Sequence, residues 1–405
     1  MIVPFSPPRI DDKIIQSVNE TLKSGWITTG LKTKLLEQKI THYTECQNTL
    51  CVNSATSGLF LMLKWFGVTK GDEVIVPAYT YCATANVVIH CGAKPVMVDI
   101  NPYDYNISLE AIKKAITPNT KVILPVDIGG VPCDYNRIFD LVNQPEIKKM
   151  FKPKTQNQKL LQRVLVMSDA AHSLGASYKG RKIGSVADVT VFSFHAVKNL
   201  TTAEGGAVCL NLPEPFDNEE VYRYLCILSL HGQSKDAFTK YKTKGWRYDL
   251  LEAGYKYNLP DVLAAIGLVE IDRYETETLL KRRKLFDNYT KDFEQFNQIA
   301  TPQYVGDDFE SSYHLYMIQV KDFEEKDRDE VMNEMFNKGI AINVHFIPLP
   351  LLSFYKKLKY NIQDFPNTYN QFKSEISLPV FYDMTNEQQQ YVVNSIKEII
   401  TKVRR

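Results

Sequence analysis

The sequence lacks the motifs that mark several large classes of metal and nucleotide proteins. The HExxH, GxxxxGK[ST] and GxGxxG motifs do not occur, which removes zincin metalloproteases, P-loop nucleotide hydrolases and the usual dinucleotide fingerprint. No cysteine is spaced as CxxC, so neither a disulfide framework nor a zinc site is indicated. The seven scattered cysteines are Cys46, Cys51, Cys82, Cys91, Cys133, Cys209 and Cys226. We therefore expect a reducing compartment and no metal site.

An excess of one charge and a long hydrophobic run are also missing. The 48 Lys and Arg residues nearly balance the 47 Asp and Glu residues, so no overall field favours nucleic acid or an anionic membrane. The longest apolar stretches are about strand length, well short of the ~20 residues of a membrane span, and no basic-then-apolar leader opens the chain. We expect a cytoplasmic protein that binds no nucleic acid and inserts no segment into a membrane.

The sequence does contain short apolar runs that alternate with amphipathic segments, a pattern typical of an α/β fold. With 405 residues and an ordinary composition, the chain is expected to form two or three packed sub-domains. Several short apolar runs are rich in Val and Ile on consecutive positions, as strands buried on both faces of a mostly parallel sheet would be. These runs lie at 50–52, 73–76, 95–100, 121–126, 164–167, 189–194 and 207–210.

The sequence on either side of this region predicts further elements. Helical spacing over 11–24 and 32–46 flanks a turn at 25–30 that carries Trp26 and several hydroxyls, which suggests a substrate lip. A Lys- and Gln-rich stretch at 144–162 has no clear periodicity and is interpreted as a surface excursion.

The last third of the chain predicts a smaller α+β domain. We place a large domain, including the N-terminal segment, at 1–275 and the small domain at 276–405. The expected elements are a long helical segment from 260 to about 293, strands at 313–320 and 340–345, and helices at 328–338 and 386–402.

Three groups of polar residues follow predicted strands. Asp169 ends one strand with His172 three residues later, and another strand ends in Ser193 with Lys198 beyond it. A hydroxyl-rich stretch at 54–57 opens an amphipathic helix. Ligands bind beyond the carboxyl ends of the strands in such sheets.

Taken singly, each of these residues has an ordinary explanation. Asp169 could cap a helix, His172 could be a core histidine and Lys198 a solvated lysine. Together they are the parts needed to hold pyridoxal 5′-phosphate (PLP). A lysine forms the Schiff base, an aspartate keeps the pyridine nitrogen protonated and a helix start binds the phosphate.

The motifs around these residues resemble those of a known family. The run SFHAVKNLTTAEGG at 193–206 resembles the cofactor-lysine motif of the DegT/StrS-type family, PLP-dependent nucleotide-sugar aminotransferases of fold type I. The segments DAAHSLG at 169–175 and YKGRKIG at 178–184 resemble the family's stretch between aspartate and lysine. Further matches run in the expected order along nearly the whole chain, at 24–30, 71–77, 95–99, 254–258 and 378–379. Within the family, the chain is most similar to enzymes that aminate a 4-keto sugar, such as the UDP-4-amino-4-deoxy-L-arabinose aminotransferase.

The resemblance implies a fold and a set of residue roles. The implied fold is a large domain with a mostly parallel seven-stranded sheet and a smaller C-terminal α+β domain. Lys198 would form the Schiff base and carry protons, Asp169 would pair with the pyridinium and His172 would lie close to the ring. Tyr81 would stack on the ring, where many members have Trp, and Ser168 stands where many have an acidic residue.

The phosphate of the cofactor is assigned by the same resemblance. Thr56, Ser57 and Ser193 would hold it within one chain. Asn258 would reach the phosphate of the neighbouring subunit, which implies a homodimer with shared active sites.

The resemblance also suggests the substrates, glutamate with its product 2-oxoglutarate, and a 4-keto nucleotide sugar that is UDP-linked. Amino-acid aminotransferases of this fold clamp the α-carboxylate with an arginine of the C-terminal domain. Between Arg283 and Arg404 this chain has only Arg328, in a helix start interpreted as solvated, so an acceptor without an α-carboxylate is expected.

Four residues are candidates for contacts with the sugar or the diphosphate, although packing or surface exposure explains each equally well: Trp26, Lys256, His314 and His345. The product would be a 4-amino sugar nucleotide for surface polysaccharide, lipopolysaccharide or glycan biosynthesis. Two alternatives stay open at this point, a 3-keto nucleotide-sugar aminotransferase and a non-catalytic regulatory protein of the same fold.

Overall fold

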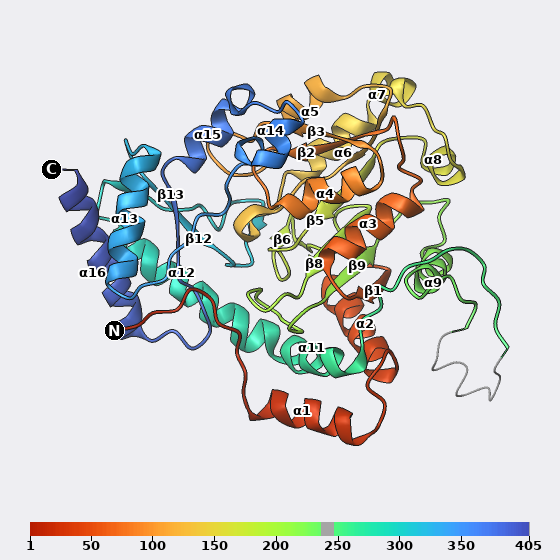
Figure 1. Cartoon of the computed structure of the whole chain (residues 1–405), viewed down its shortest axis with the longest axis horizontal. Helices are drawn as coiled ribbons and strands as arrows, with labels where there is room; N and C mark the ends of the chain where they lie inside the picture. The colour runs from red at the N-terminus through yellow and green to blue at the C-terminus, as the bar shows by residue number, and fades with distance from the viewer. Residues whose placement is uncertain (236–246, 405) are drawn as a thin grey trace.

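A computed structural model describes residues 1–235 and 247–404 of the chain. Its centre is a seven-stranded sheet with helices on both sides (Figure 1). The order across the sheet is β1-β9-β8-β5-β4-β2-β3. The strands are β1 (Asn48–Val52), β2 (Glu73–Pro77), β3 (Lys94–Val98), β4 (Thr120–Ile123), β5 (Leu165–Asp169), β8 (Val189–Ser193) and β9 (Gly206–Leu210). The α/β class, the seven strands and their mostly parallel arrangement are confirmed.

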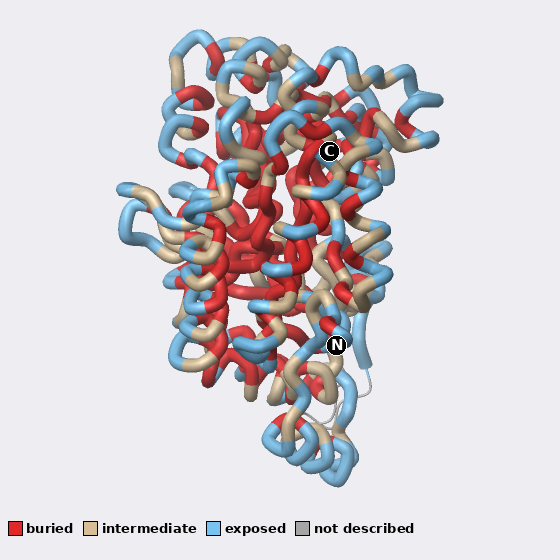
Figure 2. The backbone as a smooth tube through the Cα atoms, turned by 90° about the vertical axis from the view of Figure 1, so that its left-hand side faces the viewer, coloured by how far each residue is buried: buried red, intermediate tan, exposed pale blue. Residues whose placement is uncertain are grey.

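Strand β9 alone runs against the others, since it is antiparallel to both β1 and β8. The remaining neighbours pair in parallel. The register places Gly206, the first residue of β9, opposite both Val52 and Ser193. The carboxyl ends of β1, β5 and β8 therefore meet at one edge of the sheet. The buried backbone in Figure 2 runs through the centre of the molecule, as expected for strands covered on both faces.

Helices between the strands supply the cover that a mostly parallel sheet needs. Helix α11 packs against both α1 and α2, while α3 contacts α4, β8 and β9. The helices of this part are α1 (Asp12–Lys23), α2 (Leu31–Thr44), α3 (Ala55–Trp65), α4 (Cys82–His90), α5 (Leu109–Ala115), α6 (Tyr135–Asn143), α7 (Pro145–Met150), α8 (Gln156–Leu161), α9 (Asn218–Leu228) and α11 (Asp261–Arg273).

The C-terminal part is built on a small antiparallel sheet in the order β10-β12-β13. It lies at the end of the molecule that also carries both termini (Figure 1). Its elements are α12 (Leu280–Phe293), β10 (Ile299–Ala300), β12 (Tyr316–Val320), α13 (Glu325–Asn337), α14 (Ser353–Lys357), α15 (Pro366–Phe372), β13 (Glu375–Leu378) and α16 (Asn386–Val403). A third sheet joins the two parts through β11 (Phe309–Glu310), β6 (Ser177–Tyr178) and β7 (Arg181–Lys182).

The division at 275/276 stays a prediction, although the structure shows what lies there. A π-helical turn at Tyr274–Leu279 connects α11 directly to α12, so the helix runs on through the proposed boundary. The N-terminal segment contacts the C-terminal part, because the Val3 backbone N–H donates to the Gly339 carbonyl over 2.9 Å.

One sequence prediction about local structure is wrong, and a second stretch is more ordered than its sequence indicated. Residues 340–345 form no strand, only isolated bridges such as that of Asn343 with Ser377. The place beside β12 is taken by β13, which was not predicted. The stretch 144–162, interpreted from the sequence as a surface excursion, is largely exposed and contains the two short helices α7 and α8. It is held down by Lys154, whose Nζ lies 2.6 Å from the buried Asp72 carboxylate.

Among the helices in the described part of the chain, none combines the length and the apolar character that crossing a membrane requires.

Candidate active site

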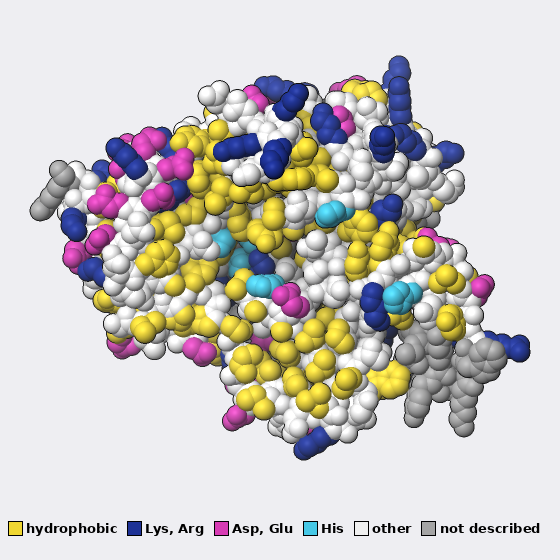
Figure 3. Space-filling view, viewed as in Figure 1, with side chains coloured by type: hydrophobic (Ala, Val, Ile, Leu, Met, Phe, Trp, Pro, Cys, Tyr) yellow, Lys and Arg dark blue, Asp and Glu magenta, His cyan; other side chains and the backbone are white. Residues whose placement is uncertain are grey.

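A cavity of about 590 Å³ opens at the edge of the sheet where β1, β5 and β8 end. Figure 3 shows histidine side chains and a basic side chain in a hollow near the centre of this face. Eight of the residues singled out in the sequence line this cavity: Thr56, Tyr81, Asp169, His172, Ser193, Lys198, His314 and His345. The fold thus brings together residues that lie nearly 300 positions apart in the chain.

Asp169, the last residue of β5, is only 6% exposed. Its Oδ2 accepts a hydrogen bond from Thr84 Oγ1 over 2.8 Å, and its Oδ1 accepts from the Ala171 backbone N–H. Burial raises the pKa of Asp169, while these hydrogen bonds and the nearby Lys198 ammonium oppose that rise. A buried carboxylate of this kind needs a cationic partner to stay ionised. The role of Thr84 was missed, because nothing in the sequence of α4 marks it.

Lys198 lies in the turn after β8, where its backbone N–H donates to the His195 carbonyl. Burial lowers the pKa of its amine to about 8, although the Asp169 carboxylate acts in the opposite direction. A larger share of this amine is therefore neutral near pH 7 than for an ordinary lysine, and a neutral amine is nucleophilic.

Two histidines form part of the cavity wall as neutral rings. The ring centroids of His172 and His314 lie 4.5 Å apart. His172 Nδ1 accepts from the Gly129 backbone N–H, and His314 Nδ1 lies 2.8 Å from Asn199 Oδ1. Burial and the neighbouring Lys198 lower the pKa of both imidazoles. The two imidazoles therefore offer polar atoms to the cavity but carry no charge.

The turn between β1 and α3 has the geometry of an anion site. Ser54 caps the helix, since its Oγ accepts from the Ser57 backbone N–H over 3.1 Å. The first turn of a helix directs backbone N–H groups and the positive end of the dipole outward, which favours a phosphate. Gly206 allows this turn to lie against β9, because a Cβ there would stand 2.6 Å from the Ala55 nitrogen.

Ser57 does not line the cavity. Its hydroxyl donates to Asn53 Oδ1 over 2.6 Å and so stabilises the turn from within. Ser54, Ala55 and Thr56 line the cavity instead.

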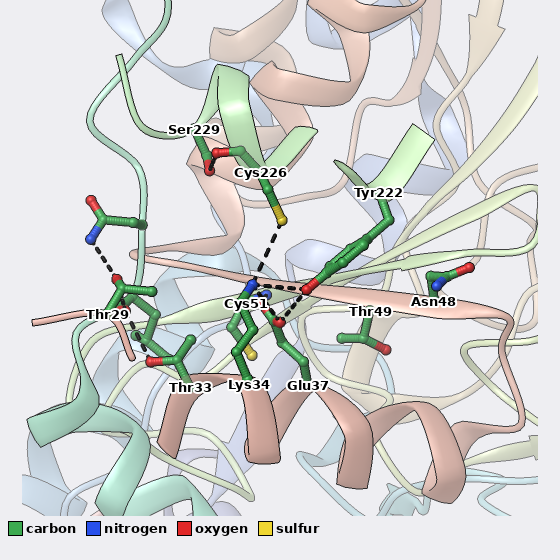
Figure 4. Close-up of polar contacts among 12 residues, drawn as sticks. Thr29, Thr33, Lys34, Glu37, Asn48, Thr49, Cys51, Tyr222, Cys226 and Ser229 are labelled. Carbon is green, nitrogen blue, oxygen red and sulfur yellow. Dashed lines mark hydrogen bonds and ion pairs between the residues drawn. The ribbon is translucent and has the colours of Figure 1, made fainter. Parts of the chain in front are cut away.

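A partly buried cluster, Lys34, Glu37 and Tyr222, holds β1 just before this turn. Glu37 on α2 accepts from the Cys51 backbone N–H through Oε1. Its Oε2 accepts from Lys34 Nζ over 3.0 Å and from the Tyr222 hydroxyl over 2.7 Å. Figure 4 shows these side chains pointing toward one another between α2, β1 and α9. The cluster ties two helices to the strand that positions the anion site.

Three other candidates lie outside the cavity of their own chain: Trp26, Lys256 and Asn258. The Asn258 amide donates to Thr29 Oγ1 over 2.6 Å, and Trp26 Nε1 donates to the Thr29 carbonyl over 3.2 Å. The Lys256 carbonyl accepts from the side chain of Asn53. Since Asn258 also bridges to Val52, this group lies beside the anion site without facing into the cavity.

The sequence had suggested that Arg328 is exposed to solvent, and the structure shows that it is not. Its side chain is buried over the Phe372 ring, and Nη1 donates to the Phe372 carbonyl over 2.7 Å. Its position in α13 keeps it out of the cavity, which no arginine lines in the described ranges 1–235 and 247–404.

The arrangement fits PLP. A buried carboxylate, an amine of lowered pKa and an anion-binding helix start surround one cavity, and these are the three polar contacts that the cofactor needs. Sequence reasoning missed Asn343 and Phe346, which also line the cavity, because Asn343 lies within a segment wrongly predicted as a strand and Phe346 directly follows it.

Known proteins share this organisation along the whole chain. The model of the DegT/DnrJ/EryC1/StrS aminotransferase family matches residues 8–151 and 156–397. The spore coat polysaccharide biosynthesis protein SpsC of Bacillus subtilis is 36% identical, with 98% of this chain and 97% of SpsC aligned.

Solved structures agree with that result. A putative sugar aminotransferase of Streptococcus pneumoniae, Spr1654, in its PMP form superposes with a TM-score of 0.95 at 43% identity over 99% of this chain and 100% of that one. A PLP form of the same protein superposes equally well. Helicobacter pylori PseC, an aminotransferase of pseudaminic acid biosynthesis, gives a TM-score of 0.86 at 26% identity over 99% of this chain and 100% of PseC. With its family motifs, its fold and the groups around its cavity in agreement, the chain belongs to the DegT/DnrJ/EryC1/StrS aminotransferase family and is a PLP-dependent aminotransferase.

Proposed function

We propose that the enzyme transfers the amino group of glutamate to a 4-keto nucleotide sugar, UDP-linked, and so makes a 4-amino sugar nucleotide for a cell-surface polysaccharide or glycan. One observation carries this proposal. The described residues that line the cavity of one subunit include no arginine, so this subunit offers no bidentate partner for the α-carboxylate of a keto-acid acceptor. The names of SpsC, Spr1654 and PseC support a sugar as the acceptor.

The residues around the cavity would divide the work. When bound, PLP supplies an aldehyde that takes up an amino group and a ring that withdraws electrons. Lys198 would attach the cofactor and then, as a neutral amine, take a proton from the donor carbon. Asp169 would hold the proton on the ring nitrogen, and the start of α3 with Thr56 and Ser193 would bind the phosphate. The ring of Tyr81 would cover the cofactor.

Purified enzyme loaded with PLP should turn over glutamate with UDP-linked 4-keto sugars, and the new amine should be found at carbon 4 by NMR. The panel includes dTDP- and GDP-linked 4-keto sugars, 3-keto sugars, and pyruvate and oxaloacetate as acceptors with an α-carboxylate. We expect a kcat/KM at least ~100-fold higher for the sugar than for the keto acids, the discrimination that a missing charged hydrogen bond allows. Preferred turnover of a keto acid would contradict the proposal. Amination at carbon 3 would contradict the 4-keto assignment and favour a 3-keto sugar as the substrate.

We also propose a homodimer in which each subunit completes its partner's site. Large apolar side chains are exposed along α1, the 25–30 turn and α2: Ile15, Leu22, Ile27, Leu31 and Leu35. Apolar side chains cover the lower part of the face in Figure 3, below the hollow. A patch of this kind is typical of a protein interface. A second copy docked here would receive Asn258 and Trp26, which lie beside this surface and outside their own cavity.

Leu31→Arg should weaken this dimer without disturbing the subunit, because Leu31 is 63% exposed. In a symmetric dimer the change occurs twice, so we expect the dimer dissociation constant to rise at least ~100-fold. Sedimentation at several concentrations measures it, and retained PLP should fall together with the dimer fraction. Phe336→Arg on α13, an equally apolar exposed site in the C-terminal part, is the control. A fully active Leu31→Arg monomer with normal PLP retention would contradict the shared site.

A cytoplasmic location remains a prediction from the sequence.

A further inference from the structure

The start of β13 carries a chain of hydrogen bonds that leads from the protein interior to the cavity. Glu375 Oε1 lies 2.5 Å from Ser377 Oγ, and Ser377 Oγ lies 2.9 Å from His345 Nδ1. The second carboxyl oxygen, Glu375 Oε2, accepts from the His345 backbone N–H over 2.9 Å. Glu375 and Ser377 are fully buried, whereas His345 lines the cavity. This series of hydrogen bonds therefore begins at a buried carboxyl group and ends at a side chain that a ligand in the cavity can contact.

These hydrogen bonds end, on the cavity side, at a single nitrogen atom of His345. The His345 ring stacks on Phe5 with a centroid distance of 5.4 Å, and its Nδ1 is engaged by Ser377. Nε2 lies 3.5 Å from the Asn343 amide nitrogen, at the long limit of a hydrogen bond, so a ligand in the cavity can replace this contact.

The protonation of Glu375 decides the direction of both hydrogen bonds. When the carboxyl is ionised it can only accept, so Ser377 donates to Glu375 and accepts from His345 Nδ1–H, which leaves Nε2 as an acceptor. When Oε1 carries a proton, it donates to Ser377, Ser377 donates to Nδ1, and Nε2 carries the imidazole proton.

We propose that Glu375, Ser377 and His345 form a proton relay that sets whether His345 Nε2 donates or accepts a hydrogen bond in the cavity. Glu375 and Ser377 are positioning residues that act through His345. The inference rests on the proposed function for the ligand, a sugar whose keto oxygen can only accept and whose amine, in the product, can donate. The donor state of Nε2 suits the keto substrate, and the acceptor state suits the amino product.

The electrostatics allow both states. Burial raises the pKa of Glu375 to about 8, opposed by its bonds to Ser377 and the His345 backbone and by Arg328. Tyr79 and Tyr105 also face this carboxyl and stay neutral, because burial raises the pKa of each phenol. Burial and the nearby Lys198 lower the pKa of His345 to about 3. The imidazole is therefore neutral in both states, and the switch is between two tautomers.

Glu375→Gln tests the relay directly. The glutamine oxygen can accept from the His345 N–H and its amide can donate to Ser377, which locks the proton on Nε2. We would record ¹⁵N spectra of imidazole-labelled apoenzyme against pH, with the His345 signals identified by their loss in His345→Gln. In the wild type, the imidazole proton should move from Nε2 to Nδ1 as the pH rises, with a midpoint near the pKa of Glu375. In Glu375→Gln they should stay fixed with the proton on Nε2.

A matched control keeps the result specific to this carboxyl. Glu270→Gln makes the same change at another buried carboxylate, which pairs with Arg273 in α11 away from the cavity, and it should leave the wild-type exchange intact. The relay would be overturned by a single His345 tautomer at all pH values in the wild type, or by an exchange that persists in Glu375→Gln.

Half-reaction kinetics test the role toward the sugar. The rate with the keto sugar should fall about fivefold above the midpoint in the wild type, the effect of losing one hydrogen bond, and should show no such fall in Glu375→Gln. The rate with glutamate should be the same in both proteins. An NMR exchange with no effect on the sugar half-reaction would overturn the assigned role of His345. Failure of every keto sugar to react would contradict the proposed function. The relay would still be tested by the NMR experiment, which needs no sugar.

Discussion

Lys198→Ala should abolish both turnover and covalent attachment of PLP. No other lysine lines the cavity in the described part of the chain, so no second amine is in place to attach the cofactor. The proton-carrying group is lost in the same change. We expect kcat to fall by at least ~10⁴-fold, as removal of a nucleophile usually gives.

The measurement combines activity with mass. Borohydride reduction of the wild type should add the mass of the reduced cofactor to a peptide containing Lys198, and the variant should show no added mass. Lys179→Ala, at an exposed lysine paired with Asp308, is the control and should keep full labelling and activity. A labelled peptide elsewhere in Lys198→Ala would move the attachment to another lysine.

The sequence was sufficient for the central sheet and the main cavity residues, for a physical reason. Strands buried on both faces have continuous apolar runs, so each could be recognised from its own residues. Parallel strands bring their carboxyl ends to one edge, so polar residues after different strands, such as Asp169 and Lys198, had to meet there.

What could not be predicted depends on contacts made across the fold. Residues 340–345 have a strand-like pattern, but β13 occupies the place beside β12. Arg328 lies in a charged stretch and is nevertheless covered by Phe372 of α15, 44 positions later in the chain. Ser57 and Asn53 bond within the turn, which only the local backbone geometry reveals. The buried carboxyl of Glu375 gave no signal at all, because its burial comes from residues far away in the chain.

Asp169→Asn should leave PLP bound but remove most of the activity. The amide has the same shape as the carboxyl, and its oxygen can still accept from Thr84, so the cavity should keep its geometry. It carries no charge, and a neutral partner cannot hold a proton on the ring nitrogen of the cofactor. Loss of one member of a buried ion pair costs about 3–5 kcal/mol, which corresponds to a fall in kcat of roughly 10²–10⁴-fold.

The two half-reactions distinguish a loss of charge from a loss of structure. Rapid mixing with glutamate and then with a keto acceptor should show both slowed to a similar extent, since each needs the ring to withdraw electrons. Asp127→Asn provides the matched control, because Asp127 is equally buried and bonds Ser173 and Tyr135 instead of lining the cavity. Near-normal turnover in Asp169→Asn, or an equal loss in Asp127→Asn, would remove the role assigned to the Asp169 charge. If the ring nitrogen depends on this carboxylate alone, Asp169→Glu should recover only part of the rate, since the longer side chain keeps the charge but displaces it in a closely packed site.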